Sequence, residues 1–201
     1  MPRVTEQHRA ARRDQILAAA VRCVAREGFH KTTMADVIRE ADLSAGAVYL
    51  YFRGKDDIIR ALAERSIGRV AHVLVAMQEQ QPVVRPEDAL QAALEELLST
   101  AGEAADDLLR VGVQAWGEAL RDEAVHATVS TQLRRLRQTM ADLVRRAQAE
   151  GLVSKQADAD SAAALLCGAI PGFILQRLVL GDLTPASYVD GLRGLVSPAG
   201  R

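Results

Sequence analysis

The sequence predicts an all-α protein, and three observations carry this prediction. Of its 201 residues, 35 are Ala and 24 are Leu, two residue types that lose little side-chain entropy in a helix. Aromatic residues make up only 3% of the chain, too few to suggest a sheet. Apolar residues recur at three- and four-residue intervals, as on one face of a helix. With 49% hydrophobic and 25% charged residues, the composition is that of a soluble globular protein and excludes a disordered or collagen-like chain.

The N-terminal part predicts a helix that begins near Arg12 and ends at Gly28, which suits a helix C-terminus. A short helix is predicted over residues 33–41. There Thr33 can cap the free N–H groups, and Asp36 completes the reciprocal pattern called a capping box.

A second short helix is predicted over residues 45–52, with Ser44 as its N-cap. Val48 and Phe52 lie four residues apart and should face inward. Two short helices separated by a brief break are typical of a helix-turn-helix, whose second helix enters the major groove of DNA. Taken alone, the pattern also fits an ordinary helical hairpin.

Charge and aromatic residues favour the nucleic-acid interpretation. Residues 1–60 carry a net charge of +3, whereas the remainder carries −4, so a basic head precedes an acidic body. Four of the seven aromatic residues also fall within residues 29–52. A basic N-terminal region of this kind is expected to bind an anion, and nucleic acid is the first candidate.

The rest of the chain predicts further helices, marked by prolines, glycines and acidic first turns. They are expected from Lys55 onward and over 86–98, 107–120, 122–151, 161–180 and 185–196. Pro171 should kink the segment 161–180. This segment includes an uncharged apolar run of 14 residues, too short to span a membrane, and is interpreted as a buried core helix.

Other features bound the class of protein. Cys23 and Cys167 lie far apart in apolar surroundings and predict buried free thiols in a reducing compartment. The polar N-terminus does not resemble a signal peptide, so we expect a cytoplasmic protein without a membrane segment. The four His residues are widely spaced, which predicts no metal site. No phosphate-binding loop and no nucleophile-and-base pattern is present, so the sequence predicts neither a cofactor nor an enzyme.

The stretch from Thr32 to Lys55 resembles the TetR family of bacterial transcriptional regulators. Its marks are the paired threonines, the order Ser-x-Gly-x-aliphatic-Tyr-x-Tyr-Phe, and a Lys three residues after that Phe. The Glu-Gly-Phe at 27–29 belongs to the same pattern. The resemblance covers about residues 10–70, a third of the chain, and a dozen positions agree in order.

The resemblance implies a three-helix helix-turn-helix DNA-binding domain at 10–55 and a helical ligand-binding and dimerisation domain at 56–201. It implies a ligand-responsive homodimer, usually a repressor, that binds a near-palindromic double-stranded operator and releases it when a small molecule binds. The alternative is a helical enzyme or adaptor that uses the hairpin only for packing. Binding to the protein's own upstream DNA would distinguish the two.

The resemblance implies that eight residues contact phosphates or bases of DNA: Thr33, Ser44, Ala45, Gly46, Ala47, Tyr49, Tyr51 and Lys55. Two positions depart from the family's pattern. Asp42 stands where a turn glycine is usual, but Asp tolerates a left-handed conformation, so we expect the turn to survive. Its carboxylate could repel phosphate if exposed. Leu50 stands where His, Tyr or Trp is usual, which removes one polar contact.

Specificity should therefore not rest on paired hydrogen bonds from the start of the second short helix. Ala45, Gly46 and Ala47 have no side chain that could make a bidentate contact with a base. The remaining possible sources of specificity are contacts with methyl groups, close approach of the backbone, DNA shape and an N-terminal arm. The arm carries Arg3, Arg9, Arg12 and Arg13.

The C-terminal domain offers weaker signals. Candidate ligand-binding residues are His72, Arg110, Gln114, Trp116 and His126. For each of them, a structural role is the favoured interpretation. Leu, Val and Ala surround Trp116, so an apolar or weakly polar effector is expected. The predicted dimer interface combines an apolar stripe and two small residues: Val125, Val129, Leu136, Met140, Leu143, Gly168 and Gly172.

Overall fold

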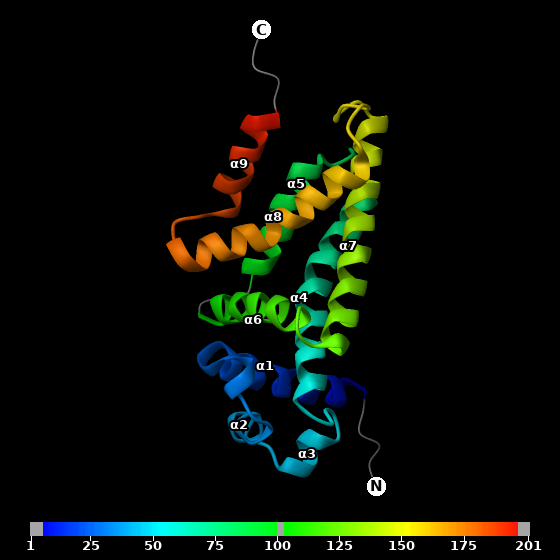
Figure 1. Cartoon of the computed structure of the whole chain (residues 1–201). Coiled ribbons are helices and arrows are strands. Elements are labelled where there is room, and N and C mark those ends of the chain that lie inside the picture. The colour runs from blue at the N-terminus through cyan, green and yellow to red at the C-terminus, as the bar shows by residue number, and fades with distance from the viewer. Residues whose placement is uncertain (1–5, 100–102, 197–201) are drawn as a thin grey trace. The chain divides into compact units, whose positions relative to one another are not determined.

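A computed structural model describes residues 6–99 and 103–196, and over these residues the chain forms nine helices and no strand (Figure 1). The all-α prediction is confirmed. In chain order the helices are α1 Glu6–Lys31, α2 Met34–Glu40, α3 Ala45–Tyr49, α4 Lys55–Gln78, α5 Pro86–Leu98, α6 Glu103–Ala119, α7 Glu123–Ala149, α8 Ala159–Leu180 and α9 Pro185–Val196.

The chain divides into two compact units. The first contains residues up to Arg65 together with Arg110–Val129, and the second contains Ser66–Leu109 and the chain from Ser130 onward. The domain boundary expected from the sequence, at residue 55, lies at the end of the helix-turn-helix motif. The first compact unit extends further along α4 and adds the end of α6 and the beginning of α7.

The core of the first unit fixes the helix-turn-helix. One face of α1 is fully buried, and its members include Ile16, Leu17 and Cys23. Helix α2 packs against α1 and against α3. Val48 and Phe52 are 0% and 2% exposed, so the prediction that they face inward is confirmed.

The core of the second unit is built around α5, which packs against α8 and α9. Phe173 of α8 and Tyr188 of α9 meet edge to face, with ring centroids 5.5 Å apart. The Tyr188 hydroxyl donates a hydrogen bond to the Ala169 carbonyl at 3.1 Å. Leu90 of α5 and Met140 of α7 are fully buried.

Helix α8 has two apolar faces. Residues such as Cys167 and Phe173 lie on the buried face, whereas Leu165 and Val179 are 69% and 77% exposed. By length and composition alone α8 is apolar enough to cross a membrane, with a mean hydropathy of 1.8. The prediction of a buried core helix is thus right for one face and wrong for the other. The helix continues as a single element through Pro171.

Both cysteines are buried and free, as predicted. Burial raises the pKa of the Cys167 thiol to about 11, so this thiol stays protonated near neutral pH.

Candidate nucleic-acid interface

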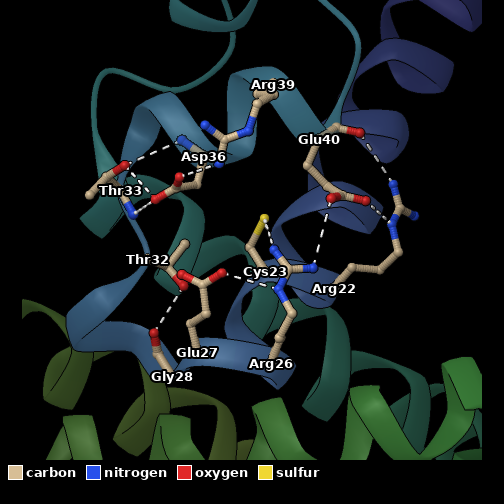
Figure 2. A network of polar contacts seen from close by, with 10 residues as sticks. All are labelled: Arg22, Cys23, Arg26, Glu27, Gly28, Thr32, Thr33, Asp36, Arg39 and Glu40. Atoms are coloured by element: carbon tan, nitrogen blue, oxygen red, sulfur yellow. Dashed lines mark hydrogen bonds and ion pairs between the residues drawn. The ribbon is translucent and has the colours of Figure 1, made fainter.

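Helix α2 begins with the predicted capping box. The Asp36 backbone N–H donates to the Thr33 hydroxyl at 3.2 Å, and the Thr33 backbone N–H donates to the Asp36 carboxylate at 3.0 Å. The Thr33 hydroxyl, which also donates to this carboxylate, is the largest cause of the lowered pKa of Asp36. The two residues lie side by side at the start of α2 (Figure 2). The side chain of Thr33 is thus engaged in capping.

Polar contacts join the end of α2 to α1 and order the link between the two helices (Figure 2). The Arg22 guanidinium bonds the Glu40 carboxylate at 2.6 Å, and this hydrogen bond is the main cause of the lowered pKa of Glu40. In the link between α1 and α2, the Thr32 hydroxyl donates to the Gly28 carbonyl at 2.9 Å. Because the Arg22–Glu40 pair is solvent-exposed, it defines the orientation of α2 more than it stabilises the fold.

The turn between α2 and α3 contains the one non-glycine residue with positive φ in the described chain. Asp42 adopts φ 53°, so the prediction that it takes the left-handed conformation of a turn glycine is confirmed. Its side chain is exposed. Ser44 then caps α3, accepting a hydrogen bond from the Ala47 backbone N–H at 3.2 Å.

Helix α3 presents a face with little side chain. The helix ends at Tyr49, earlier than predicted, and Leu50 is its C-cap. Ala45 and Gly46 are exposed, and a Cβ added at Gly46 would meet nothing within 4 Å. Tyr49 is 50% exposed, and Tyr51 is half-buried. This face allows another molecule to approach the α3 backbone closely.

Lys55 has a partner that the sequence did not indicate. Its Nζ donates to the Phe29 carbonyl at 2.7 Å and lies 3.4 Å from the His30 carbonyl. The ammonium group therefore satisfies the C-terminal end of α1, and a phosphate would have to share it.

Arginines of α1 lie beside the α3–α4 turn. A hollow is lined by Arg9, Ala10, Arg13, Leu50 and Tyr51. The guanidinium carbon of Arg13 lies 5.4 Å from the centre of the Phe52 ring, a cation–π distance. Sequence reasoning placed Arg9 and Arg13 on an arm, but they belong to α1 itself, and Arg3 lies outside the described residues.

Gln114 has a defined structural role in the first unit. Its side-chain oxygen accepts a hydrogen bond from the Phe29 backbone N–H at 3.1 Å, and its side-chain nitrogen donates to the Val24 carbonyl at 3.4 Å. These contacts lie where α1 is interrupted at Gly28, whose φ of 81° and ψ of 161° are not helical. Gln114 thus links α6 to α1.

The other ligand candidates are dispersed. His126 lies with its ring nitrogen 3.1 Å from the Ala119 carbonyl. Trp116 is 37% exposed, and Arg110 is exposed. These residues belong to the first unit, whereas His72 is exposed on the second.

A hollow of about 470 Å³ lies within the second unit, and none of the five ligand candidates lines it. Its walls are mostly apolar, formed by residues that include Val144, Leu152, Leu165, Leu166, Leu192 and Val196. Volume and lining are those of a small-molecule site. Sequence periodicity did not reveal it, because each of these residues reads as an ordinary member of an apolar helix face.

The predicted dimer stripe on α7 requires a correction. Its five apolar members are only 0–6% exposed within the single chain: Val125, Val129, Leu136, Met140 and Leu143. They pack in the protomer's own core and leave no surface for a partner. Of the two glycines, Gly168 is exposed and open, whereas a Cβ at Gly172 would meet the Tyr188 hydroxyl at 3.1 Å.

The fold and the capped, exposed second helix define a helix-turn-helix regulator, and comparison with known proteins gives the family. Residues 16–62 match the family described as bacterial regulatory proteins of the tetR family. Residues 86–197, more than half of the chain, match the C-terminal domain of BetI-type transcriptional repressors. The chain belongs to the TetR family of bacterial transcriptional regulators, whose members are soluble DNA-binding regulators and not enzymes.

Similar proteins extend this result. TtgR of Pseudomonas putida is 26% identical over 194 residues, covering 90% of this chain and 87% of TtgR. YfiR of Bacillus subtilis is 34% identical over 122 residues, 61% of this chain, and Rv1474c of Mycobacterium tuberculosis is 44% identical over 73 residues, 36% of this chain. The matched parts span 58% of YfiR and 39% of Rv1474c.

Solved structures share the fold. GusR of Salmonella enterica has a TM-score of 0.76 at 22% identity and covers 98% of this chain and all of that one. SmeT of Stenotrophomonas maltophilia, in complex with triclosan, has a TM-score of 0.74 at 22% identity, covering 92% and 91%. A transcriptional regulator of Saccharomonospora viridis in complex with choline has a TM-score of 0.72 at 26% identity, covering 93% and 96%.

Proposed function

We propose that this protein is a cytoplasmic, homodimeric repressor that binds a near-palindromic operator and releases it when a small molecule binds. The observation that carries the proposal is the exposed, nearly bare face of α3 at Ala45 and Gly46, held by the caps at Thr33 and Ser44. A helix with such a face fits the major groove, which is about 12 Å wide. No cofactor or metal enters this proposal.

The DNA contacts divide into two kinds. Ser44, Tyr49, Tyr51 and Lys55 offer hydroxyl or ammonium groups that suit phosphate and fix the register. Thr33 can donate to phosphate only if its hydroxyl gives up the hydrogen bond to the Asp36 carboxylate. Three small residues of α3 allow the backbone to approach the base edges: Ala45, Gly46 and Ala47.

Gly46→Val tests this assignment. Open space surrounds Gly46, so the variant should fold, but its side chain would hold α3 away from the groove. In a gel shift with the protein's own upstream DNA, we expect specific binding to disappear. Gly117→Val is the matched control, because Gly117 is also helical, exposed and open, and it should bind like the wild type. Normal binding by Gly46→Val would remove α3 from the interface.

The dimer is proposed to form through the second apolar face of α8. Leu165, Gly168, Leu175 and Val179 are spaced three, seven and four residues apart, which places them on one side of the helix, and all four are exposed. A second copy would remove this apolar surface from water, which stabilises association by roughly 25 cal/mol per Å². A fixed dimer is also needed to hold two DNA-reading helices about 34–36 Å apart on successive major grooves.

Val179→Glu tests the dimer. The side chain is 77% exposed in the protomer, so the protomer should still fold, but the carboxylate would be buried in the proposed interface. Sedimentation should show monomers, and operator affinity should fall to the non-specific level. Val75→Glu on α4, which replaces another exposed valine, should remain dimeric. A dimeric Val179→Glu protein would exclude this face.

The effector is proposed to be apolar or weakly polar and to occupy the 470 Å³ hollow of the second unit. Triclosan, which is bound to SmeT, is the suitable first probe, and choline, a cation bound to the Saccharomonospora regulator, is expected not to release the operator. Ala162→Phe would place a phenyl ring in part of the hollow and obstruct it, so we expect the variant to bind operator normally but not to be released by a compound that releases the wild type. Ala186→Phe, at an exposed position on α9, is the control. Release of Ala162→Phe at wild-type concentrations would place the effector elsewhere.

A further inference from the structure

Leu50 is an exposed leucine at the C-terminal end of α3. Its side chain is 84% exposed, although it directly follows the helix that is proposed to read DNA. It keeps helical geometry, with φ −66° and ψ −25°, and its backbone N–H donates to the Gly46 carbonyl at 3.3 Å. Leu50 and Gly46 therefore lie one turn apart on the same face.

The position of Leu50 relative to Gly46 decides what it can touch. Side chains on a helix lean toward its N-terminus and cover the preceding turn. The preceding turn at Gly46 carries no side chain, and nothing occupies the space within 4 Å of a Cβ there. The leucine thus stands beside the point where the α3 backbone can come closest to the groove.

The surroundings of Leu50 combine this apolar group with positive charge. It lines a hollow with Arg9, Ala10, Arg13 and Tyr51, and this lining contains no carboxylate. Two guanidinium groups beside an exposed leucine suit a duplex, whose phosphates flank base edges. In the major groove, the apolar group on a base edge is the C5-methyl of thymine.

We propose that Leu50 is a specificity-determining residue that contacts a thymine methyl group in each operator half-site. This inference rests on the proposed DNA binding by α3. The side chains of Ala45 and Ala47 cannot form hydrogen bonds with bases. On this proposal, Leu50 contributes to base selectivity through an apolar contact instead.

The test removes the methyl group and the leucine separately. Operator duplexes selected from a random pool with the wild type are synthesised with deoxyuridine in place of thymine, one position at a time. Deoxyuridine leaves the hydrogen-bonding groups unchanged. At one position per half-site we expect the wild type to lose about fourfold in affinity, the effect of one buried methyl group. Leu50→Ala should bind the thymine operator more weakly and show no further loss with deoxyuridine there.

Leu120→Ala is the matched control, because Leu120 is 85% exposed in the same unit but lies outside α2 and α3. It should behave as the wild type in every duplex. The proposal is overturned if the effect of deoxyuridine on affinity is the same for the wild type and Leu50→Ala at every position. It is also overturned if Leu50→Ala lowers the affinity by the same factor in every duplex, as the loss of a sugar or phosphate contact would. If the wild type selects no sequence at all, the proposed function itself fails, and this inference with it.

Discussion

The strongest prediction for stability concerns Gln114, whose amide joins α6 to the interruption in α1. Gln114→Ala would leave the Phe29 N–H and the Val24 carbonyl without their side-chain partner. An unsatisfied buried backbone group costs about 1–3 kcal/mol. Because one bond is 3.4 Å long and Gln114 is only half-buried, we expect a total loss of about 2 kcal/mol, at the low end for two groups. For a chain of this size, that lowers Tm by about 4–8 °C.

Thermal unfolding followed by circular dichroism measures this effect. Gln114→Met keeps most of the side-chain volume without the hydrogen bonds, so it should lose nearly as much stability as Gln114→Ala. Gln138→Ala is the control, because Gln138 is exposed and its amide bonds Asp142 on the same helix, so its Tm should change by less than about 2 °C. If Gln114→Met melted at the wild-type temperature, the amide would not hold α1, and the assigned link between α6 and α1 would be refuted.

Three further predictions concern the helix-turn-helix. Gly28→Ala should cost about 1–3 kcal/mol in urea unfolding, because φ 81° and ψ 161° are accessible almost only to glycine; an unchanged midpoint would contradict this geometry. Asp42→Gly should stabilise the protein by up to about 1 kcal/mol and tighten DNA binding, since φ is 53° and an exposed negative charge is removed; weaker binding in a gel shift would make the carboxylate a favourable contact. The lowered pKa of Asp36 means that its contribution to stability is present above the ordinary value of 3.8 and is lost as the pH falls through its folded pKa. The Tm gap between the wild type and Asp36→Ala should therefore close in acid, and a gap that widens there would reverse the sign.

Sequence reasoning succeeded where a few neighbouring residues determine the structure. The capping box of Thr33 and Asp36, the cap at Ser44 and the left-handed Asp42 all depend on residues no more than four positions apart. Local chemistry of this kind is readable from a sequence because the donors and acceptors are set by the order of the chain.

It was less successful where distant segments meet. Lys55 and Gln114 both bond to the end of α1, 26 and 85 residues away from Phe29. No local pattern indicates such partners, so one was assigned only to phosphate and the other to a ligand. The start of α1 at Glu6 was also missed, because the polar residues before Arg12 show no apolar period.

The same limit explains the dimer interface, and Leu136 tests the correction directly. Periodicity identifies an apolar stripe but not whether the same chain or a second copy covers it. An interface on the α7 stripe would mean that Leu136→Arg gives folded monomers. The structure predicts unfolding, because Leu136 is 5% exposed in the protomer and burial of an unpaired guanidinium costs several kcal/mol, a large part of a typical stability of 5–15 kcal/mol. We expect Leu136→Arg to lose cooperative melting, whereas Val179→Glu should melt cooperatively and sediment at half the mass. A folded, monomeric Leu136→Arg protein would return the interface to α7.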